Sequence, residues 1–365
     1  MAHYEIEIWN KAGEPIADIR QVCSGLEWTK TLNGSETLMF TIDLPRYEEL
    51  VRTLGYGDAP LSLMDVGGVD IRVKRNGKYL IGTNVYRFQF LTDDPSVEVT
   101  VNCVGYLNFY KTQYITASYT NTPQHEIMWS AIAICNAKTG GDYGIRQGRH
   151  EGAVVKRDRT YERKEVASLL TQMSNVIKGC DFEFTPDKKF NTYEAKGYYR
   201  PDVILSYGEG GNIQSFRFDR SIENTANYIY ALGSGDGEDI VMSTAEDTAS
   251  EMTLYRRERI LTWNSVTEQS TIDEHAQSSL HALQDILELP TITLRPNTLD
   301  MSVIDVGDTV VVNLGNYSSL SHVNGNYRIQ SIECDVDQND DEIVKLEFDD
   351  LDIDEVINAQ EEDTL

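Results

Sequence analysis

Apolar and polar residues alternate along two long parts of the chain, the first hundred residues and the part after residue 200. The clearest run is 26–45 (LEWTKTLNGSETLMFTIDLP), where apolar side chains occupy every second position from 38 to 44. Alternation with a period of two is typical of a β-strand with one buried face. An Asn-Gly pair between two such runs favours a type I′ turn, so the pattern predicts a hairpin that turns at 32–35.

A second Asn-Gly pair, Asn76-Gly77, lies between the strand-like segments 70–73 and 79–81. It predicts another hairpin, and further strands are predicted over 85–91 and 97–104. After residue 200, strands are expected at 203–205, 213–218, 226–232, 291–294, 309–313, 326–333 and 343–348. Short strands at this spacing are typical of sandwiches and barrels.

The middle of the chain has helical spacing instead. Thr122-Pro123 predicts a helix start, with Thr122 as cap and Pro123 in the first helical position. A second helix is predicted over 163–178, where apolar residues fall on one face: Val166, Leu169, Leu170, Met173 and Ile177. A capping box, Thr271-x-x-Glu274, predicts a third helix over 272–288, with Leu280, Leu283 and Leu287 on one side.

These patterns predict a mainly β fold with an α+β insert. The expected division is a first β domain at 1–106, the insert at 107–200, a second β domain with the helix 272–288 at 201–350, and an acidic C-terminal tail at 351–365. The two β-rich blocks are compatible with a distant duplication. At 365 residues, the chain is long enough for two or three domains.

Acidic residues outnumber basic ones, 59 to 32, for a formal net charge of −27. This balance argues against a broad, sequence-independent grip on nucleic acid, which needs clustered cations on phosphates. The excess is concentrated after residue 330, where Lys345 is the only base. Two interpretations remain open: a solubilising, frayed acidic tail, or an acidic channel wall past which DNA slides without sticking.

The chain has no apolar run of about 18 residues, so no transmembrane helix is expected. Its start, MAHYEIEIWNKAGEP, lacks the basic and apolar regions of a signal peptide, and we expect synthesis in the cytoplasm. The five cysteines are scattered without C-x-x-C spacing, which argues against a zinc site and a disulfide framework. Cys103 and Cys180 lie in apolar strand-like segments and are expected to be buried thiols.

Two stretches resemble metal motifs but lack essential ligands. His125-Glu126 begins like H-E-x-x-H, yet Trp129 stands where the second histidine is needed. Asp335-x-Asp337-x-Asn339 begins like a calcium loop, but position six is Asp340 rather than glycine and position twelve is Leu346 rather than glutamate. A hairpin tip between two strands explains these acids better.

Nucleotide and hydrolase motifs are also missing. Gly208-Glu209-Gly210-Gly211 is followed by a predicted strand and not by Gly-Lys-Ser/Thr, so it is no P-loop. There is no Gly-x-Ser-x-Gly elbow. The sequence therefore predicts no catalytic, cofactor-binding or metal-binding residue, no cofactor, and a protein that is not an enzyme.

Four segments resemble the central hub proteins of phage tail tips, the tail-associated hubs of long-tailed phages that are related to the trimeric hub of contractile tails. They are NKAGEPIADI (10–19), LEWTKTLNGSETLMFTI (26–42), NIQSFRFDRSIENTANYIYALG (212–233), and VGDTVVV with GNYRIQSIECDV (306–312 and 325–336). The resemblance extends over residues 3–350. It lies in the order of these segments and their general residue pattern rather than in an invariant motif.

This resemblance implies a structural virion protein at the tail tip that forms a homotrimer. Each subunit would supply two tube-like β-barrel domains, so that six barrels match the sixfold tail tube above. The implied partners are the distal tail protein ring, the C-terminus of the tape-measure protein, and fibre or receptor-binding proteins. DNA would be a partner only in transit, and no stable membrane insertion is expected.

Many relatives carry a C-terminal extension that cuts peptidoglycan or binds receptors, whereas this sequence stops at Leu365 after the acidic tail. That difference argues against enzymatic activity. Two alternatives remain open: a tail-tip cell-wall hydrolase with a site among the many carboxylates, and a carbohydrate-binding receptor protein that uses tyrosine and tryptophan on its β faces.

Overall fold

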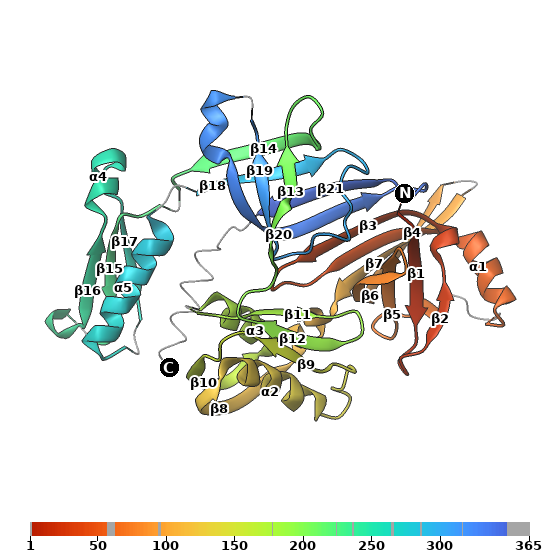
Figure 1. The fold of residues 1–365 in the computed structure, drawn as a ribbon. Helices are drawn as coiled ribbons and strands as arrows, with labels where there is room; N and C mark the ends of the chain where they lie inside the picture. Colours follow the sequence, from red (N-terminus) through yellow and green to blue (C-terminus); the bar gives the residue numbers. More distant parts are fainter. Residues whose placement is uncertain are drawn as a thin grey trace.

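A computed structural model shows how these segments are arranged (Figure 1). It describes residues 2–56, 63–93, 96–176, 178–223, 225–235, 237–263, 266–284, 287–315 and 317–348. The predicted acidic tail at 351–365 and the predicted helix position Ile177 lie outside the described residues.

A single 13-stranded sheet joins the two ends of the chain. Its first seven strands are β1 (Tyr4–Trp9), β2 (Pro15–Asp18), β3 (Cys23–Thr31), β4 (Thr37–Asp43), β5 (Asp70–Arg75), β6 (Lys78–Asp93) and β7 (Ser96–Gly105). The other six are β13 (Tyr199–Ser206), β14 (Ile213–Ser221), β18 (Leu287–Leu294), β19 (Thr309–Asn313), β20 (Gly325–Val336) and β21 (Glu342–Phe348). The strand order is β14-β18-β21-β20-β3-β4-β7-β6-β5-β1-β2, with β19 beside the start of β20 and β13 beside β19.

Eight neighbouring strands of this sheet, β14-β18-β21-β20-β3-β4-β7-β6, form two copies of one four-strand arrangement, placed side by side. The N-terminal copy has the strand order β3-β4-β7-β6 in the sheet, and the C-terminal copy has the order β14-β18-β21-β20. Within each copy, the strands are counted from first to fourth in the order in which they follow one another along the chain. Each copy therefore places its first, second, fourth and third strands next to one another, and every pair is antiparallel. The third strand of one copy, β20, pairs with the first strand of the other, β3.

One hydrophobic core serves both copies. Trp28, Phe40 and Ile42 of the N-terminal copy and Ile332 and Leu346 of the C-terminal copy are almost fully buried in the same cluster. These residues lie at alternate positions of their strands, as the sequence pattern predicts for a sheet with one buried face. The mainly β fold is therefore confirmed, whereas the domain boundaries stay a prediction.

The two Asn-Gly hairpins form with different turns. Asn76 and Gly77 both have positive φ, 52° and 75°, as the two-residue type I′ turn between β5 and β6 requires. Between β3 and β4 only Asn33 has a positive φ, 55°, and five residues connect the strands, so a type I′ turn there is a wrong prediction. The side chain of Asn33 instead binds Asp181 of the insert, a contact that local sequence does not reveal.

The strand predicted through Leu44 ends one residue earlier. Leu44 begins helix α1 (Leu44–Thr53), and the Asp43 carboxylate accepts a hydrogen bond from the backbone N–H of Arg46 at 3.0 Å. Aspartate at this cap and Pro45 in the first turn are both typical of helix starts. The prediction missed this helix because the apolar alternation of β4 continues by chance into Leu44.

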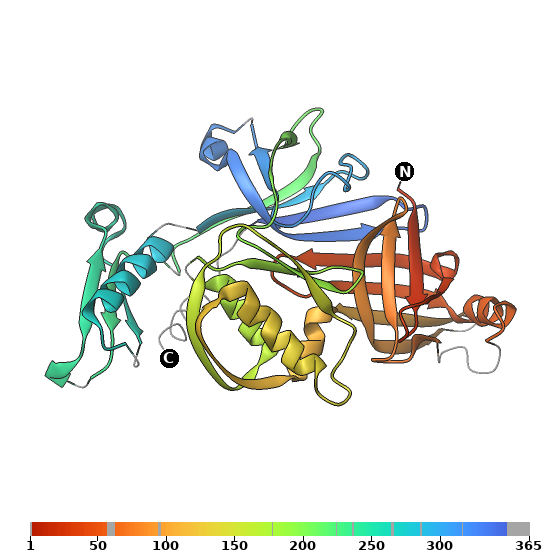
Figure 2. The same cartoon turned by 60° about the horizontal axis from the view of Figure 1, so that its bottom comes forward.

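The insert after β7 forms its own core below the large sheet (Figures 1 and 2). Its elements are η3 (Tyr106–Thr112), β8 (Tyr114–Pro123), α2 (Gln124–Asn136), β9 (Arg146–Glu151), β10 (Lys156–Glu165), α3 (Val166–Asn175), β11 (Asp181–Phe184) and β12 (Lys189–Tyr193). Strands β8 and β10 form a two-stranded ribbon, and β11, β12 and β9 form a small sheet.

The insert helices differ from their predicted limits. Pro123 ends β8 and occupies the cap position of α2, whereas the Thr122 hydroxyl donates to the Thr120 carbonyl, so the predicted Thr122 cap is wrong. Helix α3 is shorter than 163–178 because β10 continues to Glu165, and four of its predicted face residues, Val166, Leu169, Leu170 and Met173, are buried.

A small unit is inserted between β14 and β18 and lies to one side of the molecule in both views (Figures 1 and 2). It consists of β15 (Tyr228–Leu232), η4 (Gly237–Asp239), β16 (Met242–Glu246), α4 (Thr248–Leu254), β17 (Glu258–Thr262) and α5 (Gln269–Leu283). Its core includes Trp263 and the apolar side of α5. The only other elements described in the chain are η1 (Arg20–Val22) and η5 (Ser318–Val323).

Helix α5 corrects two predictions. Glu268, not Thr271, occupies its cap position, so the predicted capping box does not form at the helix start. Leu287 belongs to β18 rather than to the helix. Leu280 and Leu283 are buried as predicted.

Candidate functional surface

One face of the eight strands from β14 to β6 is polar and lies outside the hydrophobic core. On β3, Leu26 and Trp28 point into the core, and Glu27 and Thr29 between and beyond them point to the other side. The side chains that share this open face are Ser215, Arg217, Asp219, Thr291, Thr293, Ile343, Lys345, Glu347, Glu333, Asp335, Glu27, Thr29, Thr31, Thr37, Met39, Thr41, Glu98, Thr100, Asn102, Arg87, Gln89 and Leu91. We call this surface the open face.

The open face carries a negative charge excess. Lys345 lies 3.1 Å from Glu333 and 2.7 Å from Glu347, which places one cation between two carboxylates. Within the described residues, Glu27, Glu98 and Asp335 have no lysine or arginine partner. Arg217 is matched by Asp219 at 2.7 Å, and Arg87 donates to Gln89, so the carboxylates of the open face outnumber its cations.

Both lateral edges of this surface are available for further pairing. In the part of the chain that the structure describes, β14 pairs only with β18, and residues 86–93 of β6 pair only with β7. Unpaired strand edges present rows of backbone N–H and C=O groups that can pair with another chain. The β6 edge also exposes large apolar side chains: Tyr86 (60% exposed), Phe90 (46%) and Leu91 (50%).

A buried ion pair ties β5, in the N-terminal part of the chain, to β21 of the C-terminal copy. The Arg75 guanidinium donates to both carboxylate oxygens of Glu342, at 2.6 and 2.8 Å, and the two side chains are 8% and 3% exposed. The Tyr4 hydroxyl donates to the same carboxylate. The hydrogen bonds that Arg75 donates to Glu342 raise the pKa of Arg75, and burial, followed by Cys334 and Glu342, raises the pKa of Tyr4. Arg75 also lies 3.0 Å from Asp300, so it is removal of Arg75 that would leave a buried charge, that of Glu342, without its cation.

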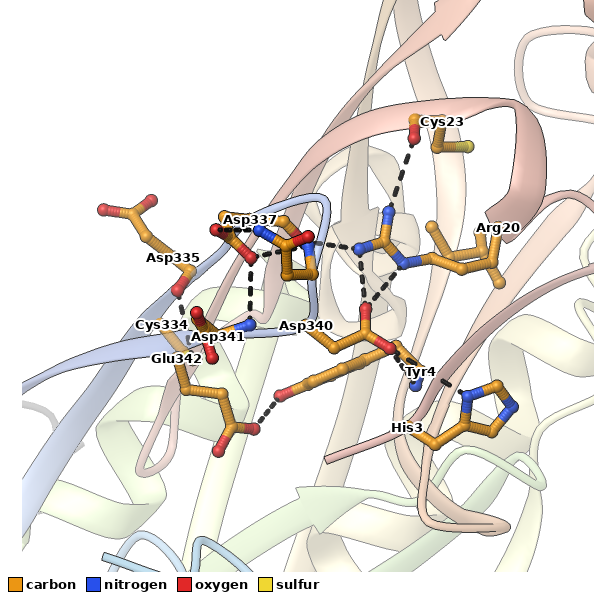
Figure 3. Close-up of polar contacts among 12 residues, drawn as sticks. His3, Tyr4, Arg20, Cys23, Cys334, Asp335, Asp337, Asp340, Asp341 and Glu342 are labelled. Atoms are coloured by element: carbon orange, nitrogen blue, oxygen red, sulfur yellow. Dashed lines mark hydrogen bonds and ion pairs between the residues drawn. The ribbon is translucent and has the colours of Figure 1, made fainter. Parts of the chain in front are cut away.

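The acidic segment that resembled a calcium loop is a hairpin tip between β20 and β21, as predicted (Figure 3). Arg20 donates to the Asp340 carboxylate at 2.7 Å and to the backbone carbonyl of Asp337. Asp340 has a positive φ of 61°, which aspartate tolerates better than most residues. Arg20 thus balances the charge of Asp340 and fastens the tip to the N-terminal part of the chain.

A second ionic network fastens the insert to the large sheet. Lys196 lies 2.7 Å from Glu183 and 3.1 Å from Asp305, and Lys30 of β3 lies 2.7 Å from Asp305. Burial would raise the pKa of Asp305, but Lys30 and Lys196 outweigh it and hold that pKa well below its ordinary value. The network therefore connects the insert, strand β3 and the segment before β19 through charged groups.

Motif residues from the sequence do not form a reactive centre. His125 lies in the first turn of α2, and its ring stacks on that of His150 with 3.9 Å between centroids. Burial, and then His150, lowers the pKa of His125. Among the described residues, no group of three histidine, cysteine or acidic side chains is placed to hold a metal ion. Cys103 and Cys180 are buried free thiols, as predicted.

Sequence reasoning missed the features that make this surface. The alternation of β3, β4, β20 and β21 identifies polar positions, but it does not show that two distant blocks share one sheet. The free edges of β6 and β14 follow from the strand order alone.

No helix in the described part of the chain is both long and apolar enough to span a membrane.

Known structures with this arrangement come from phage tails and a related secretion system. A tail protein from Neisseria meningitidis MC58 aligns with a TM-score of 0.67 at 12% identity, covering 95% of this chain and 96% of that one. The 43 kDa tail protein of prophage MuSo2 from Shewanella oneidensis gives the same score and identity, covering 96% and 99%. The Escherichia coli c3393 protein, a type VI secretion component described as similar to the T4 tail proteins gp27 and gp5, aligns at 0.51 and 10% identity, covering 89% and 73%.

A sequence search of curated proteins gives no match. The family model described as "Siphovirus ReqiPepy6 Gp37-like protein" matches residues 154–350, which is more than half of the chain. This match and the shared fold confirm the resemblance to phage tail hub proteins. The chain belongs to the siphovirus ReqiPepy6 Gp37-like family and is a phage tail protein.

Proposed function

We propose that this protein is the trimeric central hub of the tail tip, a structural component without enzymatic activity. The observation that carries the proposal is the pair of equivalent four-strand units in one sheet, with a strand edge at each end that has no partner over at least part of its length among the described residues. Three copies would supply six such units. A ring of this kind presents sixfold symmetry to the tail tube and threefold symmetry to the tip.

The junction within the chain indicates how neighbouring copies would join. There, the third strand of one unit (β20) pairs with the first strand of the next (β3). The free edges in the described part of the chain again belong to a third strand, the part of β6 beyond its pairing with β5, and to a first strand, β14. We therefore expect β6 of one copy to pair with β14 of the next, which repeats the internal junction and closes a ring by a heterologous contact.

Apolar side chains support this edge as a subunit contact. Tyr86, Phe90 and Leu91 are about half exposed along the part of β6 that lacks a second strand partner among the described residues. Exposed apolar groups gathered at a strand edge invite association. Pairing with β14 of a neighbour would cover them and satisfy the backbone groups together.

The open face would then line the channel. Unpaired Glu27, Glu98 and Asp335 would make that wall repel phosphates, so that DNA passes without adhering. Screening over roughly 8 Å at physiological salt limits this effect to a narrow bore. The hub would close the channel until host contact and then allow DNA through.

The partners of such a hub are the distal tail protein ring, the tape-measure protein and fibre or receptor-binding proteins. Placement in the virion tail is supported by the family, and the tip position is part of the proposal.

Light scattering after size exclusion tests the assembly directly. We expect a species of three times 41.3 kDa that imaging resolves as a six-unit ring. The double variant Tyr86→Lys/Phe90→Lys should lower the trimer fraction at least tenfold, because it places two cations at the apolar edge. Met252→Lys, at a 90% exposed position on α4, is the matched control and should leave the trimer intact.

Two outcomes would contradict the proposal. A monomer at every concentration, together with no threefold ring at the tips of assembled tails, would reject the trimeric hub. A trimer that is unchanged in the β6 double variant would reject the pairing of β6 with β14.

A further inference from the structure

A groove of about 490 Å³ crosses the open face near the end where the β20–β21 tip lies. Its floor includes Met39 and Ile343, which are 39% and 43% exposed. Its walls carry the carboxylates of Glu27, Asp335, Asp337 and Asp341. No lysine or arginine lines it within the described residues.

The groove contains an unfavourable cross-strand pair. Ile343, Asp335, Glu27 and Met39 form one row across β21, β20, β3 and β4, in which Asp335 lies directly opposite Glu27. Like charges directly opposite each other destabilise an antiparallel pair. In the described part of the chain, neither carboxylate has a basic partner, so the fold itself leaves this repulsion in place.

Neighbouring groups do not relieve the pair. Lys345, two residues from Ile343 on the same face of β21, is already matched by Glu333 and Glu347. Arg20 donates hydrogen bonds to the Asp340 carboxylate and the Asp337 carbonyl. The Asp335 carboxylate points away from Arg20 and Asp340 (Figure 3). Burial, followed by Asp335 and Glu333, raises the pKa of Glu27.

The strand geometry keeps the groove open. A register shift between Ser24 and Leu26 marks a β-bulge in β3, and Gly25 within it has a φ of 71°. Bulges bend a strand and redirect its side chains. A side chain at Gly25 would be strained by this φ, and glycine leaves the wall of the groove bare.

We infer that this groove docks a basic amphipathic segment of another tail protein, with an apolar side chain over Met39 and Ile343 and lysine or arginine between Glu27 and Asp335. The charge of the walls selects cations, and the apolar floor selects a peptide over a nucleic acid or a simple salt ion. The inference rests on the proposed function in one respect only, since the hub would place the groove inside the channel. There, the docked segment would occupy the bore until it is released.

Peptide binding to the full-length protein tests the inference. The probe is a labelled ten-residue peptide of alternating leucine and lysine, and its matched control replaces each lysine by glutamate. We expect fluorescence anisotropy to show saturable binding of the lysine peptide, weakened by salt, and none of the glutamate peptide.

Variants localise the site. Glu27→Gln/Asp335→Asn should weaken binding at least tenfold while raising the melting temperature, because the repulsion is removed. Met39→Ser/Ile343→Ser should also weaken it, whereas Glu98→Gln, which removes one carboxylate elsewhere on the open face, should alter binding less than twofold. Equal loss with Glu98→Gln, or unchanged binding by the Glu27/Asp335 variant, would overturn the docking site.

Light scattering on the same samples separates this inference from the hub proposal. A trimer that does not bind the lysine peptide rejects the docking site and leaves the hub standing. A monomer that binds it through Glu27 and Asp335 supports the docking site and counts against the hub.

Discussion

Glu36 ends the connection between β3 and β4, with its carboxyl enclosed beside Gly105 of β7. It is 6% exposed, and one of its carboxylate oxygens has no hydrogen-bond partner among the described residues. Burial raises the pKa of Glu36 from about 4.5 to about 7, against a smaller opposing effect of its own backbone N–H and Lys30. A buried carboxyl without a partner favours its neutral form.

The pKa of Glu36 predicts how stability depends on pH. The folded protein keeps the proton between pH 4.5 and 7, where the unfolded chain releases it, so the free energy of unfolding should fall as pH rises. The loss is about 3 kcal/mol at about 1.4 kcal/mol per pKa unit. Urea unfolding at a series of pH values should show this loss in the wild type and not in Glu36→Gln.

Glu209→Gln provides the comparison, because Glu209 is exposed and should keep the wild-type dependence on pH. If Glu36→Gln and the wild type lose stability in parallel over this range, the carboxyl of Glu36 is not the titrating group.

Glu36 and the Arg75–Glu342 pair show the limit of sequence reasoning at this scale. Both glutamates occur in polar stretches that predict exposure, and the sequence places Arg75 at a hairpin turn. Their burial follows from partners far along the chain, since Arg75 and Glu342 are 267 residues apart. Only the packing of distant segments makes these charges internal.

At the scale of elements, helix α1 shows how a local signal decides a boundary. Asp43 is both the last residue of β4 and the cap of α1, where its carboxylate accepts from the Arg46 N–H. The change from strand to helix therefore depends on one side chain, with Pro45 restricting the first turn.

Asp43→Ala should lower the free energy of unfolding by about 1 kcal/mol, the usual cost of losing a cap. Asp43→Asn should preserve most of that stability, because asparagine caps helices comparably well. Urea unfolding measures both variants, and equal losses from alanine and asparagine would show that the cap hydrogen bond is unimportant.

Strand positions were predicted better than helix limits. The predicted segments 309–313 and 343–348 match β19 and β21 almost residue for residue, because alternation reports which side chains face the core. Helix starts at Thr122 and Thr271 were wrong, since the cap signals there compete with a continuing strand and with an earlier helix start at Gln269. Capping motifs are too short to fix a boundary when tertiary contacts favour another one.

At the scale of the whole molecule, the two four-strand units are the feature by which the proposed hub would adapt a sixfold tube to a threefold tip. The units are not identical, because the connection between β3 and β4 has five residues whereas the small unit occupies the equivalent connection between β14 and β18. A ring of three chains would therefore alternate a short connection with a large one.

The proposed channel wall predicts an effect on DNA ejection. Glu98→Gln/Glu333→Gln/Glu347→Gln removes three carboxylates from the open face outside the groove, so phosphates should adhere and ejection from assembled particles should slow several-fold. The effect should increase at low salt, because screening is weaker there. Time-resolved fluorescence of released DNA measures the rate.

The matched control neutralises three exposed acids elsewhere, Glu162→Gln/Glu209→Gln/Glu246→Gln, and should eject at the wild-type rate. Ejection that is equally fast in both triple variants and the wild type would show that the charge of the open face does not influence DNA passage.

The sequence by itself determined the β-rich character of both ends, the helical insert between them, the absence of a recognisable catalytic motif and the acidic balance. These properties follow from alternation, helical spacing and composition, which are local or additive. The tertiary structure decided that both β blocks form one sheet with a shared core, which strands are left at its edges, and which acids share the open face. Pairing such as that of β20 with β3 joins residues some 300 positions apart. It depends on the packing of the whole chain rather than on any local pattern.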